Sequence, residues 1–335
     1  MSEFNPLTTL PSVPPDSWLR FNQTWRPSDL SPHLYQAMID VGNGIELCVE
    51  AGGNPDNPPL LFVAGFGSQM MFWSDNFLKQ FMGAGFFVIR FDNRDTGLSS
   101  KINHLSKLPR TNIVKMIAKN TIGLSNAREK VAYTLPDMAN DVAGLIRALN
   151  LPKANIIGAS MGGMIGQILS AKYPDLVDRL ILIFSSANSA FARLPKPVQF
   201  STFFRKPQSH SERDMVRHAV WFMTAVGSPG HLDIKGTRAV AHRRYQRCFH
   251  PLGMAQQMNA ILATGSIESY TRQITVPTLI IHGTKDGLIH QSHGKHIAKL
   301  IKNSRFVAVD GLAHDLPAYY QPHLVHLVKV HCLGV

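Results

Sequence analysis

The sequence predicts a mostly parallel, doubly wound α/β sheet, and three observations support this fold class. Continuous apolar runs recur along the 335-residue chain, turn residues bound each run, and helical periodicity fills several of the gaps between runs. Runs that are apolar throughout, rather than alternating, are typical of parallel strands covered by helices on both faces. We therefore expect a sheet of about eight strands, with a helical insertion after the sixth strand.

The strands are expected in the following order. A hairpin comes first, because an Asn43-Gly44 turn joins YQAMIDV to IELCVEA. The buried runs that follow are LLFVAG, FFVIRF, NIIGA, LILIF, TLIIHG and RFVAV. Apolar spacing indicates a short helix over residues 75–83 and longer helices over residues 137–150, 161–173 and 317–330.

Three segments depart from this alternation. Residues 1–33 are rich in Pro, Ser, Asn and Thr and predict an N-terminal arm. Residues 101–135 form a long excursion to which the sequence assigns no role. Residues 187–273 contain helical patterns without a strand candidate, which predicts a helical cap. Residues 34–186 and 274–335 then form the α/β core.

Composition limits the function classes. A hydrophobic fraction of 44% with only 17% charged residues excludes a largely disordered chain. The formal charge of +12 raises the question of nucleic-acid binding, but the only basic run interleaved with aromatic residues is AHRRYQRCFH. We interpret that run as a solvated helix face that could attract anionic substrates or surfaces, and we expect no nucleic-acid partner.

The cysteines and the start of the chain bear on location. Cys48, Cys248 and Cys332 are odd in number and widely spaced, which predicts neither a disulfide framework nor a metal site. The first residues lack the pattern of a signal peptide, and no later run is long enough to span a membrane. We expect a cytoplasmic protein without membrane insertion, either a monomer or a homodimer.

The stretch IIGASMGGMIGQ contains the candidate nucleophile. Ser160 lies between Gly158 and Gly162, where the strand NIIGA is followed by an amphipathic helix. A strand, G-x-S-x-G and a helix in this order are typical of a serine held on a sharp, strained turn. The alternative is a small-residue turn without chemistry, but the context favours a nucleophile.

A serine nucleophile needs a histidine base and an acid that orients it. Asp286 follows the strand TLIIHG and His314 follows the strand RFVAV, so both lie where α/β sites are built. Asp310 is the reserve acid, whereas His282 lies within a strand and is expected to be a packed core residue. The run HQSHGKH lacks the spacing of a zinc site, so we expect neither a metal nor another cofactor.

Two backbone N–H groups are expected to bind the developing oxyanion. Met161 follows the nucleophile and supplies one, and Phe66 in the loop AGFGSQ supplies the other. The expected substrate contacts are Gly65, Met70, Trp73 and Trp221. Asp92 and Arg94, in FDNRDTGLSS, are expected to tie loops together rather than to act in catalysis.

Several stretches in the same order resemble the α/β-hydrolase superfamily, and specifically bacterial serine esterases of the aclacinomycin methylesterase type. They are AGFGSQMMFW, VIRFDNRDTGLSS, YTLPDMANDVAGLIRALN, IIGASMGGMIGQILSAKYP, VPTLIIHGTKDGLIHQSHGKHIAKLI and VDGLAHDLP. Many relatives carry His-Gly where this chain has Ala64-Gly65. The helical region 187–273 shows no family motif, so the resemblance implies hydrolysis of an ester without naming it.

The function expected from these residues is a carboxylesterase that acts through an acyl-enzyme. Its substrate is expected to be a small hydrophobic ester. The same triad also supports lactone hydrolysis, carbon–carbon bond hydrolysis and perhydrolase chemistry, and these alternatives remain open. A hydrolase-like receptor that binds ligand without turnover is the alternative outside enzymes. The presence of all three triad residue types argues against that receptor.

Overall fold

The computed structural model describes residues 15–102, 111–202 and 204–335. Residues 1–14 of the expected arm and residues 103–110 of the excursion lie outside the described residues. Within the described part, nine strands form one sheet in the order β1-β2-β3-β5-β4-β6-β7-β8-β9. The strands are β1 Arg26–Pro27, β2 Tyr35–Asp40, β3 Glu46–Gly52, β4 Pro59–Val63, β5 Phe87–Phe91, β6 Ala154–Ala159, β7 Val177–Ile183, β8 Thr278–Gly283 and β9 Ser304–Val309.

The pairing of the strands confirms the predicted fold class. β1, β2, β3 and β5 pair antiparallel in sequence, and β5, β4, β6, β7, β8 and β9 pair parallel. The strand beyond the eight expected ones is β1, which consists of two residues and lies in the predicted arm. A two-residue strand has no periodicity that a sequence pattern could reveal. The helical insertion follows β7, which is the sixth strand when β1 is left aside.

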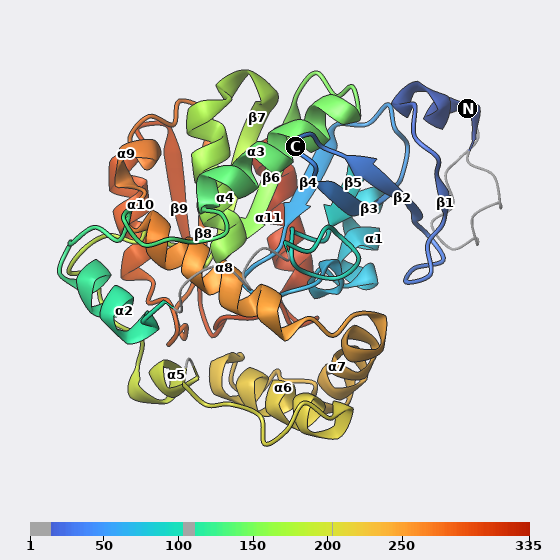
Figure 1. Cartoon of the computed structure of the whole chain (residues 1–335). Helices are drawn as coiled ribbons and strands as arrows, with labels where there is room; N and C mark the ends of the chain where they lie inside the picture. Colours follow the sequence, from blue (N-terminus) through green and yellow to red (C-terminus); the bar gives the residue numbers. More distant parts are fainter. Residues whose placement is uncertain (1–14, 103–110, 203) are drawn as a thin grey trace.

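The two faces of the sheet carry separate hydrophobic cores. Successive residues of a strand point to opposite faces, so Leu61 and Val63 join one core while Leu60 and Phe62 join the other. The first face is covered by α3 Leu135–Ala148, α4 Met161–Lys172 and α10 Ser292–Leu300, and the second by α1 Asp75–Gly83 and α11 Gln321–Leu333 (Figure 1). Strands buried on both faces explain why the predicted runs are apolar throughout.

The start of α3 shows how the sequence sets a helix boundary. Thr134 forms a capping box with Asp137, in which the Asp137 carboxylate accepts the Thr134 backbone N–H at 2.8 Å. Pro136 follows in the first turn, where its missing N–H costs no hydrogen bond. The pattern had placed this start at residue 137, two residues late, because it followed apolar spacing rather than the cap.

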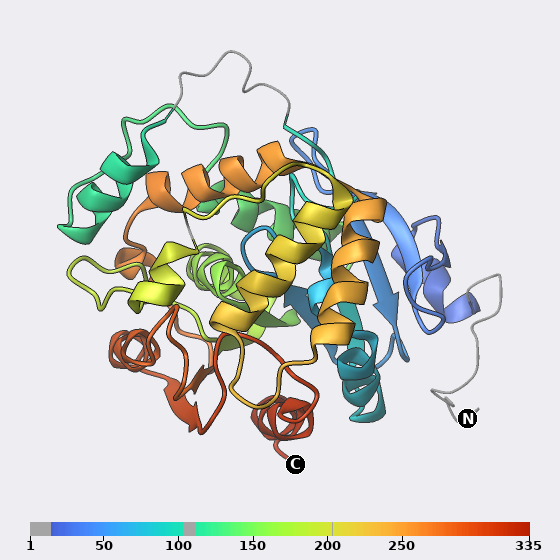
Figure 2. The same ribbon diagram turned by 90° about the horizontal axis from the view of Figure 1, so that it is seen from below.

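The insertion between β7 and β8, here called the helical segment, contains five helices in its described residues. They are α5 Pro197–Ser201, α6 Glu212–Val226, α7 Ile234–Arg247, α8 Pro251–Thr264 and α9 Glu268–Thr271. Figure 1 shows α5, α6 and α7 below the sheet, and in Figure 2, seen from below, α6 and α7 run side by side in front of it. α8 packs against α3 and α2.

The described residues of the excursion include the helix α2 Ile113–Thr121. Met116 on α2 packs with Leu262 and Ala263 of α8 in a small separate core. The Asn126 side chain donates to the Leu262 carbonyl at 3.1 Å and so fixes the return of the excursion to α8. None of the helices in the described residues has the length and apolar character needed to cross a membrane.

Candidate active site

Ser160 lies on a strained turn between β6 and α4. Its φ is 54° and its ψ is −120°, a backbone conformation that a non-glycine residue rarely adopts. A Cβ at Gly158 would collide with the Gly162 backbone, and a Cβ at Gly162 would collide with the Val63 carbonyl. The two glycines therefore allow β6, α4 and β4 to approach closely enough to form the turn that the sequence predicts.

Asp286 and His314 meet at the carboxyl ends of β8 and β9. His314 Nδ1 lies 2.8 Å from Asp286 Oδ2, and the other carboxylate oxygen accepts the backbone N–H groups of Leu288 at 2.9 Å and Ile289 at 2.8 Å. Burial raises the pKa of the Asp286 carboxyl. The charges and hydrogen bonds of His314 and His282 lower this pKa by more than burial raises it, so it lies well below its ordinary value. Asp286 is therefore an ionised, fixed partner for His314.

The alternative acids are engaged elsewhere. Asp310 is exposed and accepts the Thr284 hydroxyl at 2.8 Å. Asp315 is buried and accepts both the hydroxyl and the backbone N–H of Ser228, so neither carboxylate contacts the His314 ring. His282 is fully buried, and its Nε2 lies 2.8 Å from the Ile289 carbonyl and 3.6 Å from Asp286. Its contact with Asp286 is a feature that the sequence pattern did not show.

Ser160 and His314 are connected through the end of β7. The Ser160 N–H donates to the Ile183 carbonyl at 3.0 Å, and the next residue, Phe184, has its ring centroid 4.5 Å from that of His314. Phe184 has a φ of 38°, so the chain turns sharply directly after β7. Among the described residues no hydrogen bond joins His314 to the Ser160 hydroxyl, whereas the bond between His314 and Asp286 is formed.

The loop after β4 lies against Ser160. A Cβ built at Gly65 would lie 3.3 Å from the Ser160 Cβ and 4.0 Å from its Oγ, so a larger residue at position 65 would crowd the serine. Met161 is buried at the first position of α4, and Phe66 is half-buried. Among the described residues, neither the Phe66 N–H nor the Met161 N–H donates a hydrogen bond outside regular helices and strands.

Two residues of the helical segment hold the backbone of this loop. The Gly67 N–H donates to Gln257 Oε1 at 2.8 Å, and the Gly67 carbonyl accepts Arg244 Nη2 at 2.7 Å. Gln257 also donates to the Arg94 carbonyl at 3.0 Å, which connects the loop to the segment after β5. The position of Phe66 therefore depends on contacts from α7 and α8, more than 170 residues further along the chain.

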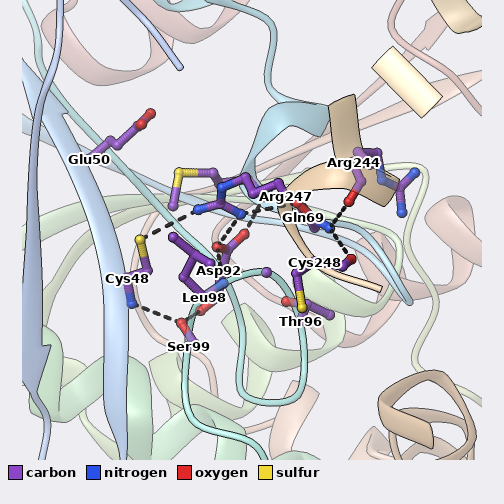
Figure 3. A network of polar contacts seen from close by, with 12 residues as sticks. Cys48, Glu50, Gln69, Asp92, Thr96, Leu98, Ser99, Arg244, Arg247 and Cys248 are labelled. Carbon is purple, nitrogen blue, oxygen red and sulfur yellow. Dashed lines mark hydrogen bonds and ion pairs between the residues drawn. The ribbon is translucent and has the colours of Figure 1, made fainter. Parts of the chain in front are cut away.

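A buried cluster around Asp92 anchors the same loop (Figure 3). Asp92 accepts the Met70 N–H at 2.8 Å and the Leu98 N–H at 3.0 Å, and it pairs with Arg247 of α7 at 2.6 Å. Arg247 also donates to Gln69 at 3.0 Å. Burial lowers the pKa of Arg247, but the charge and hydrogen bond of Asp92, together with Cys48 and Glu50, raise it overall, so the Arg247 guanidinium stays charged.

Gln69 completes the connection, as Figure 3 shows. Its side-chain amide donates to the carbonyls of Arg244 at 2.9 Å and Cys248 at 3.1 Å at the end of α7, where the Arg244 carbonyl also accepts the Cys248 N–H at 3.1 Å. Cys48 lies 3.4 Å from Arg247, and burial raises the pKa of its thiol to about 12. Asp92 thus ties loops together, as the sequence suggested, but the arginine that reaches it from the helical segment was not foreseen.

Arg94 is the other residue of FDNRDTGLSS that was expected to tie loops together. Its guanidinium forms a two-bond pair with Asp141 of α3, with Nε 2.6 Å from Oδ2. Both side chains are nearly inaccessible to solvent. The contacts of Arg94 hold α3 against the loop after β5 and involve neither Ser160 nor His314.

The expected substrate contacts lie in different environments. Gly65 faces Ser160, whereas Trp73 is fully buried between Phe62 and Phe77 and packs within the core. Met70 is also fully buried. Trp221 on α6 is half-buried, and the Arg205 guanidinium lies 4.2 Å above its ring.

The histidines of HQSHGKH contact other protein groups. His290 lies 3.0 Å from the Ser292 hydroxyl, His293 lies 2.9 Å from both the Ser186 hydroxyl and the Arg193 carbonyl, and His296 pairs with Glu268 at 2.8 Å. These contacts join α10 to the strand end after β7 and to α9. Within the described part of the chain, no three His, Cys, Asp or Glu residues are arranged to hold a metal ion.

Comparisons with known proteins show the family of this chain. Residues 58–317 match the family described as alpha/beta hydrolase fold. The chain belongs to the α/β-hydrolase fold family. The predicted resemblance to bacterial methylesterases is confirmed: rhodomycin D methylesterase DnrP of Streptomyces peucetius is 24% identical over 300 residues, which cover 83% of this chain and 92% of that enzyme.

Two lactonases are further relatives of this α/β-hydrolase. The 3-oxoadipate enol-lactonase 2 of Acinetobacter baylyi is 22% identical over 254 residues, covering 75% of this chain and 80% of that enzyme. The crystal structure of the enol-lactonase from Burkholderia xenovorans superposes with a TM-score of 0.64 at 20% identity and covers 89% of this chain and all of that one. The structural likeness supports the fold assignment.

Proposed function

We propose that this α/β-hydrolase cleaves carboxylic esters with Ser160 as nucleophile, His314 as base and Asp286 as the acid that orients the base. The observation that carries the proposal is the ionised Asp286 bound to His314 at the strand ends next to a serine on a strained turn. In this mechanism His314 Nε2 removes the proton of the Ser160 hydroxyl as Oγ attacks the ester carbonyl. Asp286 then stabilises the imidazolium that forms.

The mechanism requires the Ser160 hydroxyl to approach His314. Catalytic hydrogen bonds are often long in proteins without ligand and shorten when the substrate is bound. A rotation of the serine side chain about its Cα–Cβ bond moves only Oγ, so the strained backbone can stay in place. The His314 imidazolium donates its proton to the alkoxide as the ester C–O bond breaks, so the alcohol leaves and the acyl-enzyme forms. His314, neutral again, then deprotonates a water molecule that attacks the acyl-enzyme, and the proton returns to Ser160 Oγ as the acid is released. No cofactor takes part.

The proposed oxyanion hole consists of the backbone N–H groups of Phe66 and Met161. Their support comes from the closeness of Gly65 to Ser160 and from the position of Met161 at the start of α4. Such donors contribute most when they are fixed before the reaction begins. The contacts of Gly67 with Gln257 and Arg244 would provide this fixation.

We propose that the helical segment acts as a cap over the nucleophile. Its residues reach the loop after β4 from three positions: Arg244, Arg247 and Gln257. The half-buried side chains of Phe66 and Trp221 are the apolar surfaces we assign to substrate binding, together with Gly65. We do not assign Trp73 to the pocket because it is buried in the core. A small, hydrophobic ester fits these surfaces best.

Lactone hydrolysis is the second candidate. A lactone is a cyclic ester, so the same nucleophile, base and oxyanion donors would open it through the same acyl-enzyme. The two enol-lactonases among the relatives make this alternative specific. A linear ester releases its alcohol, whereas a lactone keeps alcohol and acid in one product, so product analysis separates the two.

The experiment is a panel of p-nitrophenyl esters of graded acyl length together with a panel of unsubstituted lactones. We expect wild-type protein to hydrolyse short and medium acyl esters and the Ser160→Ala variant to show no burst and no turnover. Mass spectrometry of the intact protein would show the acyl group on Ser160. Turnover that persists in Ser160→Ala, or ligand binding without any hydrolysis, would exclude the proposed esterase.

A further inference from the structure

Exposed apolar side chains gather on one part of the surface. Eight large apolar residues of the described chain are more than half exposed. Two of them, Tyr319 and Val335, lie near the C-terminus. The other six belong to two segments, residues 113–124 and 190–206, and they are Val114, Ile122, Leu124, Phe191, Leu194 and Val198.

The two segments are adjacent in space. The Phe191 N–H donates to the Thr121 carbonyl at 2.9 Å, and a Cβ at Gly123 would lie 3.1 Å from the Ala190 Cβ. Figures 1 and 2 both show α2 and α5, which these segments contain, on the same side of the molecule. We call the combined area the apolar–basic surface. Contiguous exposed apolar area on a soluble domain marks an interaction site more often than scattered apolar residues do.

The charges of this surface have one sign. Five cationic side chains on the two segments are exposed, and neither segment contains an Asp or Glu. They are Lys115, Arg193, Lys196, Arg205 and Lys206. The acids that pack nearby are already paired, Glu129 with Lys119 at 3.4 Å and Glu268 with His296 at 2.8 Å.

The charge pattern decides between occupants. A second copy of the chain would bring five exposed cations against five more, which repel each other. An anionic surface instead neutralises the cations while it receives the apolar side chains between them, which is the pattern of proteins that bind in the headgroup region of a bilayer. The apolar residues project from two helices, turns and loops, and of the six only Phe191 borders a pocket among the described residues, so they suit a deformable interface.

We propose that the apolar–basic surface docks this protein onto bilayers that contain anionic lipids. Docking holds the protein at the membrane surface without a spanning helix, in keeping with the helices described. The proposal does not depend on ester hydrolysis, because none of the residues it uses belongs to the proposed triad or oxyanion hole. It gives a role to the charge of +12 that nucleic-acid binding does not explain.

The test is co-sedimentation with vesicles of phosphatidylglycerol and phosphatidylcholine, compared with phosphatidylcholine alone, at low and at physiological salt. We expect wild-type protein to bind the anionic vesicles, with affinity that falls as salt rises. The Val114→Gln/Phe191→Asn variant removes apolar contact and should bind at least about tenfold more weakly at every salt concentration. Asn at position 191 tolerates the φ of 55° found there.

Charge reversal provides the second comparison. The Lys115→Glu/Lys196→Glu variant should lose at least about tenfold in affinity for anionic vesicles. The matched control is Lys153→Glu/Lys302→Glu, which changes net charge by the same amount at exposed positions outside the surface and should keep most of the binding. Unchanged p-nitrophenyl ester turnover and thermal unfolding show that each variant is folded.

Four outcomes would overturn the proposal. Wild-type protein could fail to bind anionic vesicles even at low salt, or the control pair could lose as much binding as Lys115→Glu/Lys196→Glu, which indicates adsorption by net charge. A dimer that Val114→Gln/Phe191→Asn dissociates would identify a second copy as the occupant. Binding to soluble polyglutamate as tight as to vesicles, with the same loss in both variants, would indicate an acidic protein partner.

Discussion

Arg247 near the end of α7 lies 2.6 Å from Asp92, the residue that follows β5. This contact joins the helical segment to the core at a point where both side chains are buried. The same arginine reaches Gln69, whose own amide returns to the end of α7. The pair is thus part of a closed ring of contacts that includes the loop beside Ser160.

Replacement of Arg247 by Met should lower the free energy of unfolding by about 3 kcal/mol, because the buried Asp92 charge loses its cation. Urea denaturation measures the change. Arg243→Met is the matched control on the same helix, since Arg243 is exposed and should cost less than about 0.5 kcal/mol. Equal effects of the two substitutions would contradict a stabilising role for the buried pair.

Gln257→Leu should reduce kcat by about tenfold while KM changes little, because the loop that carries Phe66 loses the acceptor of the Gly67 N–H. Steady-state kinetics on the best p-nitrophenyl ester gives both constants. Gln256→Leu is the control: this neighbour donates to the Ile102 carbonyl at 2.7 Å and does not touch the loop. If Gln256→Leu reduces kcat as much, the effect is one of general packing in α8.

Asp286→Asn should reduce kcat by about 10³-fold or more, because the amide neither orients nor stabilises the His314 imidazolium as a carboxylate does. Asp310→Asn should leave kcat within about twofold of the wild type, since Asp310 contacts Thr284 instead. Kinetics on purified, folded variants decides between the two acids. Full activity in Asp286→Asn would assign the role to another residue.

The two buried aspartates near His314 should change stability with pH in opposite directions. The folded pKa of Asp286 is lowered, so its stabilisation is complete above about pH 4 and is lost as pH falls through the folded pKa. Burial raises the folded pKa of Asp315, although Ser228 counteracts this, so stability decreases as pH rises from about 4 through that pKa.

Urea denaturation between about pH 2.5 and 7 tests these signs. The wild type should lose stability as pH falls below about 4, and Asp286→Asn should lack the part of this loss that comes from Asp286. The buried Asp315 should make the wild type less stable as pH rises above about 4, and Asp315→Asn should lack this decrease in stability. Curves for the two variants that run parallel to wild type would show that neither group titrates differently in the folded and unfolded states.

Gly162→Ala should prevent proper folding or cost about 3 kcal/mol or more, because the added methyl group collides with the Val63 carbonyl. Gly83→Ala is the matched control, since nothing lies within 4 Å of a Cβ there and the residue ends α1. It should be neutral or stabilise by up to about 1 kcal/mol. Thermal unfolding of both variants measures the contrast.

The sequence predicted those parts of the fold that leave a local pattern. Each continuous apolar run became a strand, and in all of them except the partly exposed edge strand β9, burial on both faces explains the apolar residues. Ser160 could be singled out because its glycines and the strand–helix order together specify the turn. Asp286 was preferred over Asp310 because a residue close to the histidine in sequence seldom reaches the far nitrogen of its ring, and the structure brings Asp286 and His314 together.

The remaining features depend on residues that are distant in sequence. Arg247 and Gln257 lie in helices whose periodicity says nothing of which loop they will reach. Trp73 looked like a pocket residue because it follows the loop beside Ser160, but the chain turns it into the aromatic core. The exposure of Phe191 could not be predicted from the sequence, since it depends on whether residues distant in the chain pack over the ring.

The contacts of Gly67 have a consequence for recombination between relatives. Both polar groups of its backbone are held by Arg244 and Gln257, so the geometry beside Ser160 depends partly on residues of the helical segment. A chimera that receives residues 187–273 from another hydrolase would make different hydrogen bonds to the backbone of this loop. Substrate range and reaction rate would then change together, even with every residue of the proposed triad intact.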